Sequence, residues 1–309
     1  MKTEQETETI FYFKNGIGNF VMMTPALQML AMADRSGKVD VCIVDEWRDS
    51  RRQAFEDLMQ SWKYIQNIIR FPKDKFRKYR RWFWTHHGEN SAALPIFRSR
   101  GKDVTNARFN WNGTLKHESE YYVNAVNRLG IHGDIPRQDV PTAPGPILEQ
   151  KRKGPKIVLC DGSFDKEQKL RKKWPHYPEL ADVLVKYYDA NIYRIGFGKE
   201  LKDVKAGSDF VGKLSITQTA KVISQADLFI TTDTGNMHIG DALQVKMLVI
   251  FGGSLVSKNG PLSRNAHIIR AGLPCQPCQS GRNFKRCEDV KCLKNLTVGD
   301  LMAKVKKHI

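Results

Sequence analysis

A strand–helix–strand pattern in the second half of the sequence decides the fold class. Residues Leu228–Phe251 read LFITTDTGNMHIGDALQVKMLVIF. Leu228–Thr231 and Met247–Phe251 are short apolar runs typical of buried parallel strands, and a helix is expected between them at Asn236–Ala242. Because parallel strands need a crossover of this kind, the segment predicts an α/β fold with a parallel sheet.

The same alternation extends along the chain in both directions. Further strands are expected at Ile10–Phe13, Val39–Val44, Ile65–Phe71, Lys156–Cys160 and Asn191–Ile195. Further helices are expected at Phe20–Ala33, Gln53–Lys63, Glu118–Leu129, Tyr177–Tyr188, Ile216–Gln225 and Val298–His308. Thr24-Pro25 has the form of an N-cap and a first-turn proline, so the first helix is expected to begin either at Phe20 or at this pair.

A linker is expected between two such halves. Thr142–Lys156 has no apolar period, and prolines and glycines gather in and beside it, at Pro141, Pro144, Gly145, Pro146, Gly154 and Pro155. At roughly 150 residues per domain, the 309 residues suggest about two domains. We therefore predict domains at residues 1–148 and 149–309.

The balance of charge is the unusual global feature. Lysine and arginine number 50 against 33 acidic residues, a formal net charge of +17. Such a charge attracts nucleic acid, anionic lipid headgroups, phosphorylated glycans or nucleotides, although it also serves solubility alone. No apolar run approaches the roughly 20 residues that span a bilayer, and Met1–Thr9 is too polar for a secretory signal. A cytoplasmic protein is therefore expected.

The stretch Arg70–Arg108 interrupts the alternation. It holds eleven basic residues and three acidic ones. Aromatic residues are interleaved with them, among them Phe76, Tyr79, Trp82, Phe83, Trp84 and Phe97. This composition suits sugar stacking or contact with nucleic acid, and it equally suits an amphipathic helix whose aromatic side chains belong to the core.

Three segments that follow strands have the composition of ligand-binding turns. Thr232–His238 places a carboxylate, hydroxyls and backbone N–H groups at the start of a helix, which suits a diphosphate. The alternative is a simple helix cap with His238 in the core. Ser163–Pro175 is a basic loop that either covers a phosphate or is a solvated charge run. Gly16-Ile17-Gly18 permits a tight turn, but Val21 stands where the dinucleotide fingerprint has its third glycine.

These motifs, in this order, resemble glycosyltransferase family 9, the heptosyltransferases of lipopolysaccharide synthesis. The matching segments are Gly16-Ile17-Gly18-Asn19-Phe20, Thr24-Pro25-Ala26-Leu27, Lys173-Trp174-Pro175, Thr232-Asp233-Thr234-Gly235-Asn236-Met237-His238, Phe251-Gly252 with Pro261, and Cys275 to Leu293. Lys173-Trp174-Pro175 resembles a Lys-x-Trp-Pro segment of the family, and the Thr232 segment is similar to its Asp-Ser/Thr-Gly-x-x-His signature.

The resemblance implies the GT-B architecture, with two Rossmann-like domains facing a central cleft, acceptor on the first and donor on the second. It implies inverting transfer from ADP-heptose without a metal at the reacting centre. Lys173, Thr234 and Gly235 would stabilise the departing diphosphate, since such donors matter most where charge develops. Asp233 and His238 would orient the donor. The other expected donor-binding residues are Gly16, Gly18 and Ser163.

One position departs from the family. The family places an aspartate, the proposed general base, where this chain has Asn19. An amide cannot accept a proton from the acceptor hydroxyl, although Asn19 can still bind a sugar hydroxyl. The replacement is expected among His117, Glu118, Glu120 and Asp161, with Glu118 or Glu120 favoured. Otherwise the activity is altered or lost, and the chain is a binding module for sugar nucleotide or nucleic acid.

Four of the six cysteines lie close together near the end of the chain. Cys275, Cys278, Cys287 and Cys292 have the spacing of a tetrahedral sulfur site, so a structural zinc or iron is expected, with reduced thiols or a disulfide as the alternative. Cys42 and Cys160 lie in apolar runs and are expected to be buried. The cluster resembles the iron-binding finger of autotransporter heptosyltransferases, which modify proteins and assemble into large rings, so the resemblance also implies homo-oligomers.

Three classes of acceptor fit these features, namely lipopolysaccharide core, protein and DNA. Lipopolysaccharide core suits the positive charge and would bring the chain to the inner membrane leaflet as a peripheral protein. The cysteine finger points to protein as the acceptor. Phage enzymes of the same architecture glycosylate DNA, and the charge suits the phosphate backbone.

Overall fold

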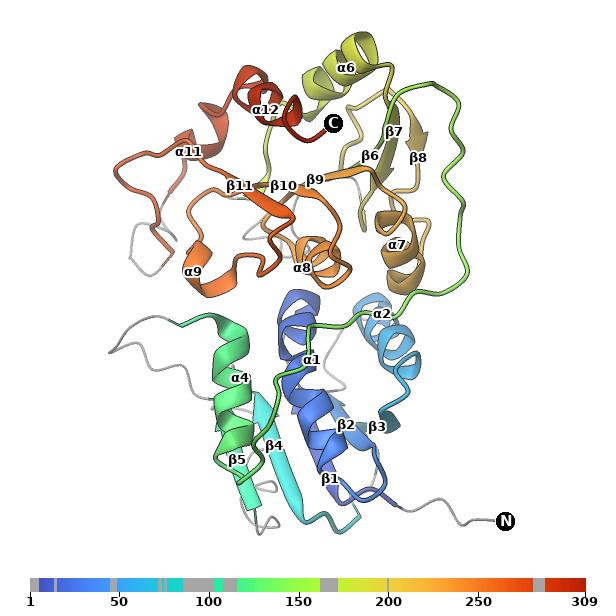
Figure 1. Cartoon of the computed structure of the whole chain (residues 1–309), viewed down its shortest axis with the longest axis vertical. Coiled ribbons are helices and arrows are strands. Elements are labelled where there is room, and N and C mark those ends of the chain that lie inside the picture. Colours follow the sequence, from blue (N-terminus) through green and yellow to red (C-terminus); the bar gives the residue numbers. More distant parts are fainter. Residues whose placement is uncertain are drawn as a thin grey trace. The chain divides into compact units, whose positions relative to one another are not determined.

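The structure, a computed structural model, describes the chain except residues 1–5, 14–15, 45–48, 72–73, 75–76, 86–102, 108–115, 162–171, 199 and 280–286. It consists of two compact units, Met1–Pro141 and Thr142–Ile309 (Figure 1). The predicted boundary at 148/149 lies slightly beyond this division. The residues between belong to the second unit because Ala143 N donates to Thr217 O, and the Gln225 side chain bonds Pro146 O and Leu148 N.

The first unit is built on a five-stranded parallel sheet, coloured blue to green in Figure 1. Its strands, in the order β3-β2-β1-β4-β5, are β1 Thr9–Phe13, β2 Val39–Val44, β3 Ile65–Phe71, β4 Arg81–Thr85 and β5 Asp103–Ala107. Its described helices are α1 Ile17–Met32, α2 Asp49–Gln60 and α4 Glu118–Asn127. The chain leaves β1 for β2 on one side and later adds β4 on the other, so the carboxyl end of β1 is a switch point of the sheet.

Helix α1 begins earlier than the Thr24-Pro25 pair predicted, and Pro25 lies inside it. A proline has no N–H, so the carbonyl of Val21 lacks its usual helical donor. The hydroxyl of Thr24 donates to Val21 O at 2.8 Å instead, and it accepts a hydrogen bond from Asp139 N at 2.9 Å. The pair that resembles a helix start therefore lies within the helix, where the Thr24 hydroxyl replaces the donor that Pro25 lacks.

Where the structure describes it, the basic and aromatic stretch contains the end of β3, all of β4 and β5 and the residues just before β4, so the alternative of an amphipathic helix is wrong there. Trp82, Phe83 and Trp84 of β4 are buried, and so is Tyr79. Arg77 is paired with Asp40 at 2.9 Å, and the Tyr79 hydroxyl bonds the same carboxylate. These aromatic rings therefore belong to the core and offer no stacking surface, while Phe76 and Phe97 lie outside the described residues.

The second unit is built on a six-stranded parallel sheet in the order β11-β10-β9-β6-β7-β8. Its strands are β6 Lys156–Cys160, β7 Asn191–Ile195, β8 Ser208–Asp209, β9 Leu228–Thr232, β10 Met247–Ile250 and β11 Ala266–Ile269. Its described helices are α6 Tyr177–Tyr188, α7 Ile216–Ile223, α8 Gly235–Ala242, α9 Val256–Asn259, α11 Lys291–Lys294 and α12 Val298–Val305.

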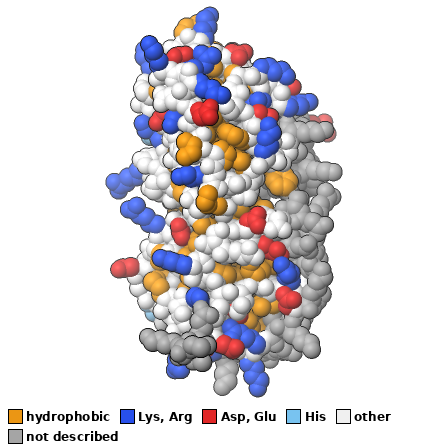
Figure 2. Space-filling view, turned by 90° about the vertical axis from the view of Figure 1, so that its right-hand side faces the viewer, with side chains coloured by type: hydrophobic (Ala, Val, Ile, Leu, Met, Phe, Trp, Pro, Cys, Tyr) orange, Lys and Arg blue, Asp and Glu red, His pale blue; other side chains and the backbone are white. Residues whose placement is uncertain are grey.

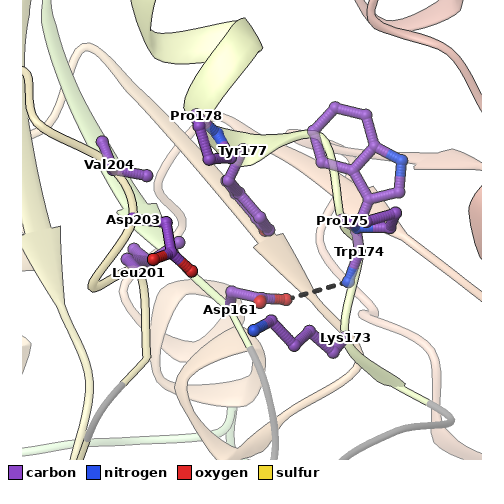
Figure 3. A pocket seen from close by; sticks show the side chains of 9 residues that line it. All are labelled: Asp161, Lys173, Trp174, Pro175, Tyr177, Pro178, Leu201, Asp203 and Val204. Atoms are coloured by element: carbon purple, nitrogen blue, oxygen red, sulfur yellow. Dashed lines mark hydrogen bonds between the residues drawn. The ribbon is translucent and has the colours of Figure 1, made fainter.

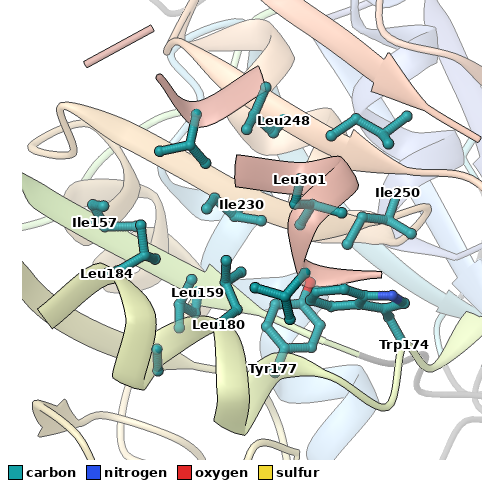
Figure 4. Close-up of a cluster of buried hydrophobic side chains, with 14 of the residues drawn as sticks. Ile157, Leu159, Trp174, Tyr177, Leu180, Leu184, Ile230, Leu248, Ile250 and Leu301 are labelled. Carbon is teal, nitrogen blue, oxygen red and sulfur yellow. The ribbon is translucent and has the colours of Figure 1, made fainter. Parts of the chain in front are cut away.

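Apolar side chains on one side of this second sheet form its main core (Figure 4). Ile157 and Leu159 of β6, Ile230 of β9 and Leu248 and Ile250 of β10 meet the inward side chains of α6 and α12. On the other side, α8 lies very close to the sheet, because a Cβ on Gly240 would stand only 2.5 Å from Met247 Sδ. The alternation predicted for these strands and helices is confirmed.

The topology of the second sheet fixes where a ligand would bind. Strand β6 lies at the centre, with β7 on one side and β9 on the other, and Cys160 is in register with Thr231. Ligands of open α/β sheets bind at the carboxyl ends of the strands where the order reverses. Asp161 follows β6 and Asp233 follows β9, so both lie at this point.

Candidate functional site

The corner between β9 and α8 has the form of an anion site. Thr234 is the N-cap of α8, yet its side chain makes no capping hydrogen bond. The hydroxyl oxygens of Thr232 and Thr234 are buried, and neither has a hydrogen-bond partner among the described residues. Buried polar atoms normally find partners, so these hydroxyls indicate a ligand position beside the helix N-terminus.

An ion pair stands at the same corner. Lys172 Nζ lies 2.8 Å from Asp233 Oδ2, and both side chains are largely buried. Burial alone would raise the pKa of Asp233, but the Lys172 ammonium, a hydrogen bond from Ser254 and the charge of His238 bring that pKa below its usual value. Asp233 is therefore held as a carboxylate.

Lysine 172 was missed by the sequence prediction, which selected Lys173. The strict spacing Lys-x-Trp-Pro places its lysine at 172, and that spacing is the signal that identifies it. The structure brings Lys172, rather than Lys173, to Asp233, while Lys173 is exposed.

Lys173 lines a separate pocket of about 250 Å³ (Figure 3). The carboxylates of Asp161 and Asp203 face the same pocket, whose apolar wall comes from Trp174, Pro175, Tyr177, Pro178, Leu201 and Val204. Asp161 Oδ1 accepts a hydrogen bond from Trp174 N at 3.1 Å, which anchors the segment that carries Lys172 and Lys173 to the end of β6. The expected donor ligand Ser163 lies outside the described residues.

The predicted residues of the first unit gather at the carboxyl end of β1. Gly16 is the N-cap of α1 in extended conformation, and Gly18 and Asn19 lie in the first turn of the helix. Asn19 Nδ2 donates to Glu118 Oε1, and the Tyr122 hydroxyl donates to the same oxygen at 2.8 Å. The structure therefore brings Asn19 and Glu118 together.

The other two candidate bases on this side are Glu120 and His117. Glu120 is exposed on α4. His117 is the N-cap of α4, where its Nδ1 accepts from Ser119 N and lies 2.7 Å from Ser119 Oγ. The ring of His117 is thus engaged in starting the helix.

The four clustered cysteines influence one another electrostatically. Burial, followed by the charges of Cys278, Cys287 and Cys275, raises the pKa of the Cys292 thiol to about 11. Among the described residues, however, no three Cys, His, Asp or Glu side chains are arranged to hold a metal ion. Residues 280–286 of the finger lie outside the described part.

Taken with the topology, these observations define a class of protein. The chain has two α/β units, each built on a parallel sheet, and the second has a corner of the form of an anion site at the switch point of its sheet. This is the GT-B-like fold of glycosyltransferases. In the described part of the chain, no helix is both long and apolar enough to cross a membrane.

The comparisons with known proteins narrow this class. Residues 137–287 match the model of glycosyltransferase family 9 (heptosyltransferase). The chain is 33% identical over 98 residues to lipooligosaccharide heptosyltransferase 2 of Campylobacter jejuni, a match covering 31% of this chain and 30% of that enzyme. Matches to such curated relatives span less than half of their lengths.

Solved structures extend the likeness to the whole chain at the level of fold. ADP-heptose lipopolysaccharide heptosyltransferase II of Escherichia coli is similar with a TM-score of 0.72 at 16% identity, covering 97% of this chain and 98% of that one. The iron-containing dodecameric glycosyltransferase TibC of enterotoxigenic E. coli gives a TM-score of 0.63 at 13% identity, covering 99% and 77%. The match to the glycosyltransferase family 9 (heptosyltransferase) model thus covers residues 137–287, and the likeness of the whole chain to these solved structures is one of fold.

Proposed function

We propose that this chain is an inverting glycosyltransferase that moves heptose from ADP-heptose to a hydroxyl of an anionic acceptor, lipopolysaccharide core. The observation that carries the proposal is the corner at Thr232–Thr234, where two buried hydroxyls without described partners lie beside a helix N-terminus. A diphosphate supplies the acceptor oxygens that such a corner lacks. The family's curated relatives are named as heptosyltransferases of lipooligosaccharide and lipopolysaccharide.

The residues of the second unit divide the work of the donor site. The Thr232 and Thr234 hydroxyls and the N–H groups at Gly235 bind the phosphates. Lys172 approaches the diphosphate from Asp233 and stabilises the negative charge that grows as ADP departs. Asp233 and His238 orient the sugar, and Lys173 adds positive charge from the neighbouring pocket. On the acceptor side, Gly16 and Gly18 keep the backbone open at the first turn of α1, and a carboxylate supplied by α4 is the base.

ADP binding and donor turnover test the donor site together. We expect calorimetry to detect ADP binding to the wild-type protein, and Lys172→Gln to weaken it at least tenfold, since a charge-assisted bond to phosphate is lost. Lys186→Gln, the same change on an exposed lysine of α6, is the control and should leave ADP binding unchanged. Equal ADP affinity in the two variants would contradict the role given to Lys172.

The acceptor is identified by mass gain. Incubation with ADP-heptose and, separately, lipopolysaccharide lacking the added heptose, a peptide library or duplex DNA should add one heptose to the lipopolysaccharide only. This proposal places the protein in the cytoplasm, in peripheral contact with the inner leaflet. On the face seen in Figure 2, lysine and arginine side chains are spread over the surface with acidic ones between them. Gain on peptide or DNA would name a different acceptor, and donor binding without turnover would identify a binding module.

We further propose a structural zinc or iron held by Cys275, Cys278, Cys287 and Cys292, as in an all-sulfur site. The electrostatic influence of the other three thiols on Cys292 supports it, and the similar protein TibC is described as iron-containing. The metal would cross-link the finger and take no part in the transfer. Elemental analysis should find about one metal per chain, lost in Cys275→Ser and kept in Cys42→Ala. Equal metal content in both variants would refute the site. TibC is also described as dodecameric, so light scattering should detect a homo-oligomer.

A further inference from the structure

Helix α4 places the buried carboxylate of Glu118 in contact with Asn19, the position at which the family has its aspartate. Glu118 is 1% exposed and Tyr122 is fully buried, whereas Asn19 is partly exposed on the first turn of α1. Asn19 Nδ2 and the Tyr122 hydroxyl both donate to Glu118 Oε1. The carboxylate thus lies directly behind the exposed amide.

We propose that the general base of this chain has moved from position 19 to position 118, so that Glu118 takes the proton of the acceptor hydroxyl while Asn19 positions it. The proposal rests on the transferase function above. An Asn amide N–H and an acceptor O–H are both donors, so an incoming hydroxyl replaces Asn19 Nδ2 at Oε1 without leaving the carboxylate unsatisfied. Displaced from Oε1, the Asn19 amide still offers its oxygen and N–H groups to the sugar.

The geometry separates Glu118 from the other carboxylate of the same helix. Residues two apart on a helix do not face the same side. Glu118 faces α1, as its bond to Asn19 shows, and Glu120 is exposed. Glu120 therefore serves as a matched control rather than as a second base.

Tyr122 fixes the second bond of the carboxylate. Burial, the charge of Glu118 and their hydrogen bond raise the pKa of Tyr122 well above its usual value, although a bond with Asn19 opposes this. The phenol therefore stays protonated and continues to donate to Oε1. Of these two donors to Oε1, the Tyr122 hydroxyl stays in place and the Asn19 amide is exchanged for the substrate.

The transfer step balances with these residues. The acceptor oxygen forms a bond to the anomeric carbon of the heptose, and its proton passes to a carboxylate oxygen of Glu118. The bond between the anomeric carbon and the phosphate oxygen breaks, and its electron pair leaves with ADP. Glu118 then returns its proton to water.

The test compares single variants with an exchanged pair. Steady-state kinetics with ADP-heptose and lipopolysaccharide lacking the added heptose are measured from pH 4 to 9, alongside ADP affinity and Tm. We expect Glu118→Gln to lower kcat/KM by about 100-fold or more while ADP affinity is unchanged. Glu120→Gln should stay within about twofold of wild type, as expected for an exposed surface change. The double variant Asn19→Asp/Glu118→Gln should recover at least about tenfold over Glu118→Gln, because the carboxylate returns to position 19.

Each outcome has a single meaning. The acid limb of the kcat/KM profile, set by a carboxylate, should disappear in Glu118→Gln and return in the double variant. Wild-type rates in Glu118→Gln, or no recovery in a folded double variant, would overturn the base while leaving the transferase intact. Wild-type protein that binds ADP without turnover, but gains turnover as Asn19→Asp, would also overturn it. Failure of ADP to bind wild type would overturn the transferase and this proposal together.

Discussion

The Lys172–Asp233 pair sets the electrostatics of the corner that we propose as the donor site. Taking two charges out of water costs several kcal/mol per ion, and their attraction compensates only when the geometry is good. The 2.8 Å contact and the additional bond from Ser254 meet that condition for Asp233. Such a pair is weak evidence for stability, and a better explanation of its presence is a ligand that needs a fixed positive charge.

Removing the lysine should expose the cost of the buried acid. We expect Lys172→Met to destabilise the second unit by roughly 3–5 kcal/mol at pH 7, because Asp233 is left charged and unpaired. The folded pKa of Asp233 lies below its unfolded value, so the pair contributes stability above about pH 4 and loses it as pH falls through the folded value. Urea unfolding at pH 7 and pH 3 measures both, and the difference between wild type and variant should shrink at pH 3. A difference that is equal at both pH values would contradict this assignment.

At this scale the sequence predicts which residues matter better than how they are paired. The Asp233–His238 segment and the departure at Asn19 can be recognised from the sequence, because motif and spacing identify them. The choice of Lys172 over Lys173 follows from the strict Lys-x-Trp-Pro spacing, whereas no pattern encodes the hydrogen bond from Trp174 N to Asp161 that anchors this segment. The contact between Asn19 and Glu118 joins positions 99 residues apart and needs the fold.

Two elements show how single residues shape a helix. In α1 the hydroxyl of Thr24 takes over the acceptor that Pro25 leaves without a donor. In α8 the absence of a side chain at Gly240 lets the helix approach Phe229 and Met247 of the sheet. The first residue preserves continuity within a helix, and the second sets its distance from the strands.

Changing Thr24 tests the hydrogen bond from its hydroxyl to Val21 O in α1. We expect Thr24→Val to cost about 1–3 kcal/mol, since Val21 O loses its partner in a buried place and Asp139 N loses one in a partly buried place. Thr24→Ser keeps the hydroxyl and should cost less than about 1.5 kcal/mol. Chemical denaturation followed by circular dichroism compares them. Equal losses would show that the methyl group, not the hydroxyl, is what matters.

Filling the contact at Gly240 tests the packing of α8. Alanine in a helix is favoured over glycine by roughly 1 kcal/mol, but at Gly240 the new methyl collides with Met247 and Phe229. We expect Gly240→Ala to destabilise by about 1–3 kcal/mol through overpacking. Gly299→Ala in α12, whose nearest neighbour would lie 3.6 Å away, is the control and should stabilise by up to about 1 kcal/mol. Stabilisation by both changes would contradict the close approach of α8.

Sequence periodicity predicts most elements of the two sheets but not all of them. Strands β6, β7, β9 and β10 are short apolar runs and are recognised directly. Strand β4 is hidden because its buried tryptophans stand beside arginine, a composition that also suits a ligand surface. Strand β5, with the sequence DVTNA, carries too little apolar character to be recognised.

At the scale of the whole molecule, each unit has a core of its own. The second unit closes its core around β6, β9 and β10, and the first around β1 and β4. The proline-rich connection is bound to the second unit through Gln225. Two separate cores allow each unit to respond to a ligand independently.

Ligand binding should therefore stabilise one unit selectively. At an ADP concentration 100 times Kd, binding contributes about 2.7 kcal/mol to whatever opens with the site. Hydrogen exchange followed by mass spectrometry should show slower exchange in Thr232–Ala242 and Lys172–Tyr177 and unchanged exchange in β1, β2 and β3. Protection that is confined to the first unit would contradict the donor site.

The segment Lys172–His176 is also hydrogen-bonded to residues near the end of the chain. Trp174 Nε1 donates to Leu296 O at 2.8 Å, and His176 Nε2 donates to Lys294 O at 3.0 Å. Lys294 is the last residue of α11, which contains Cys292, and Leu296 lies just beyond that helix. A change at Cys292, by oxidation, alkylation or chelation, is therefore expected to disturb the hydrogen bonds that hold Trp174 and His176 beside Lys172. Under the proposed function, thiol reagents in a storage buffer would then change the affinity of the protein for a nucleotide, a practical concern for anyone who purifies it.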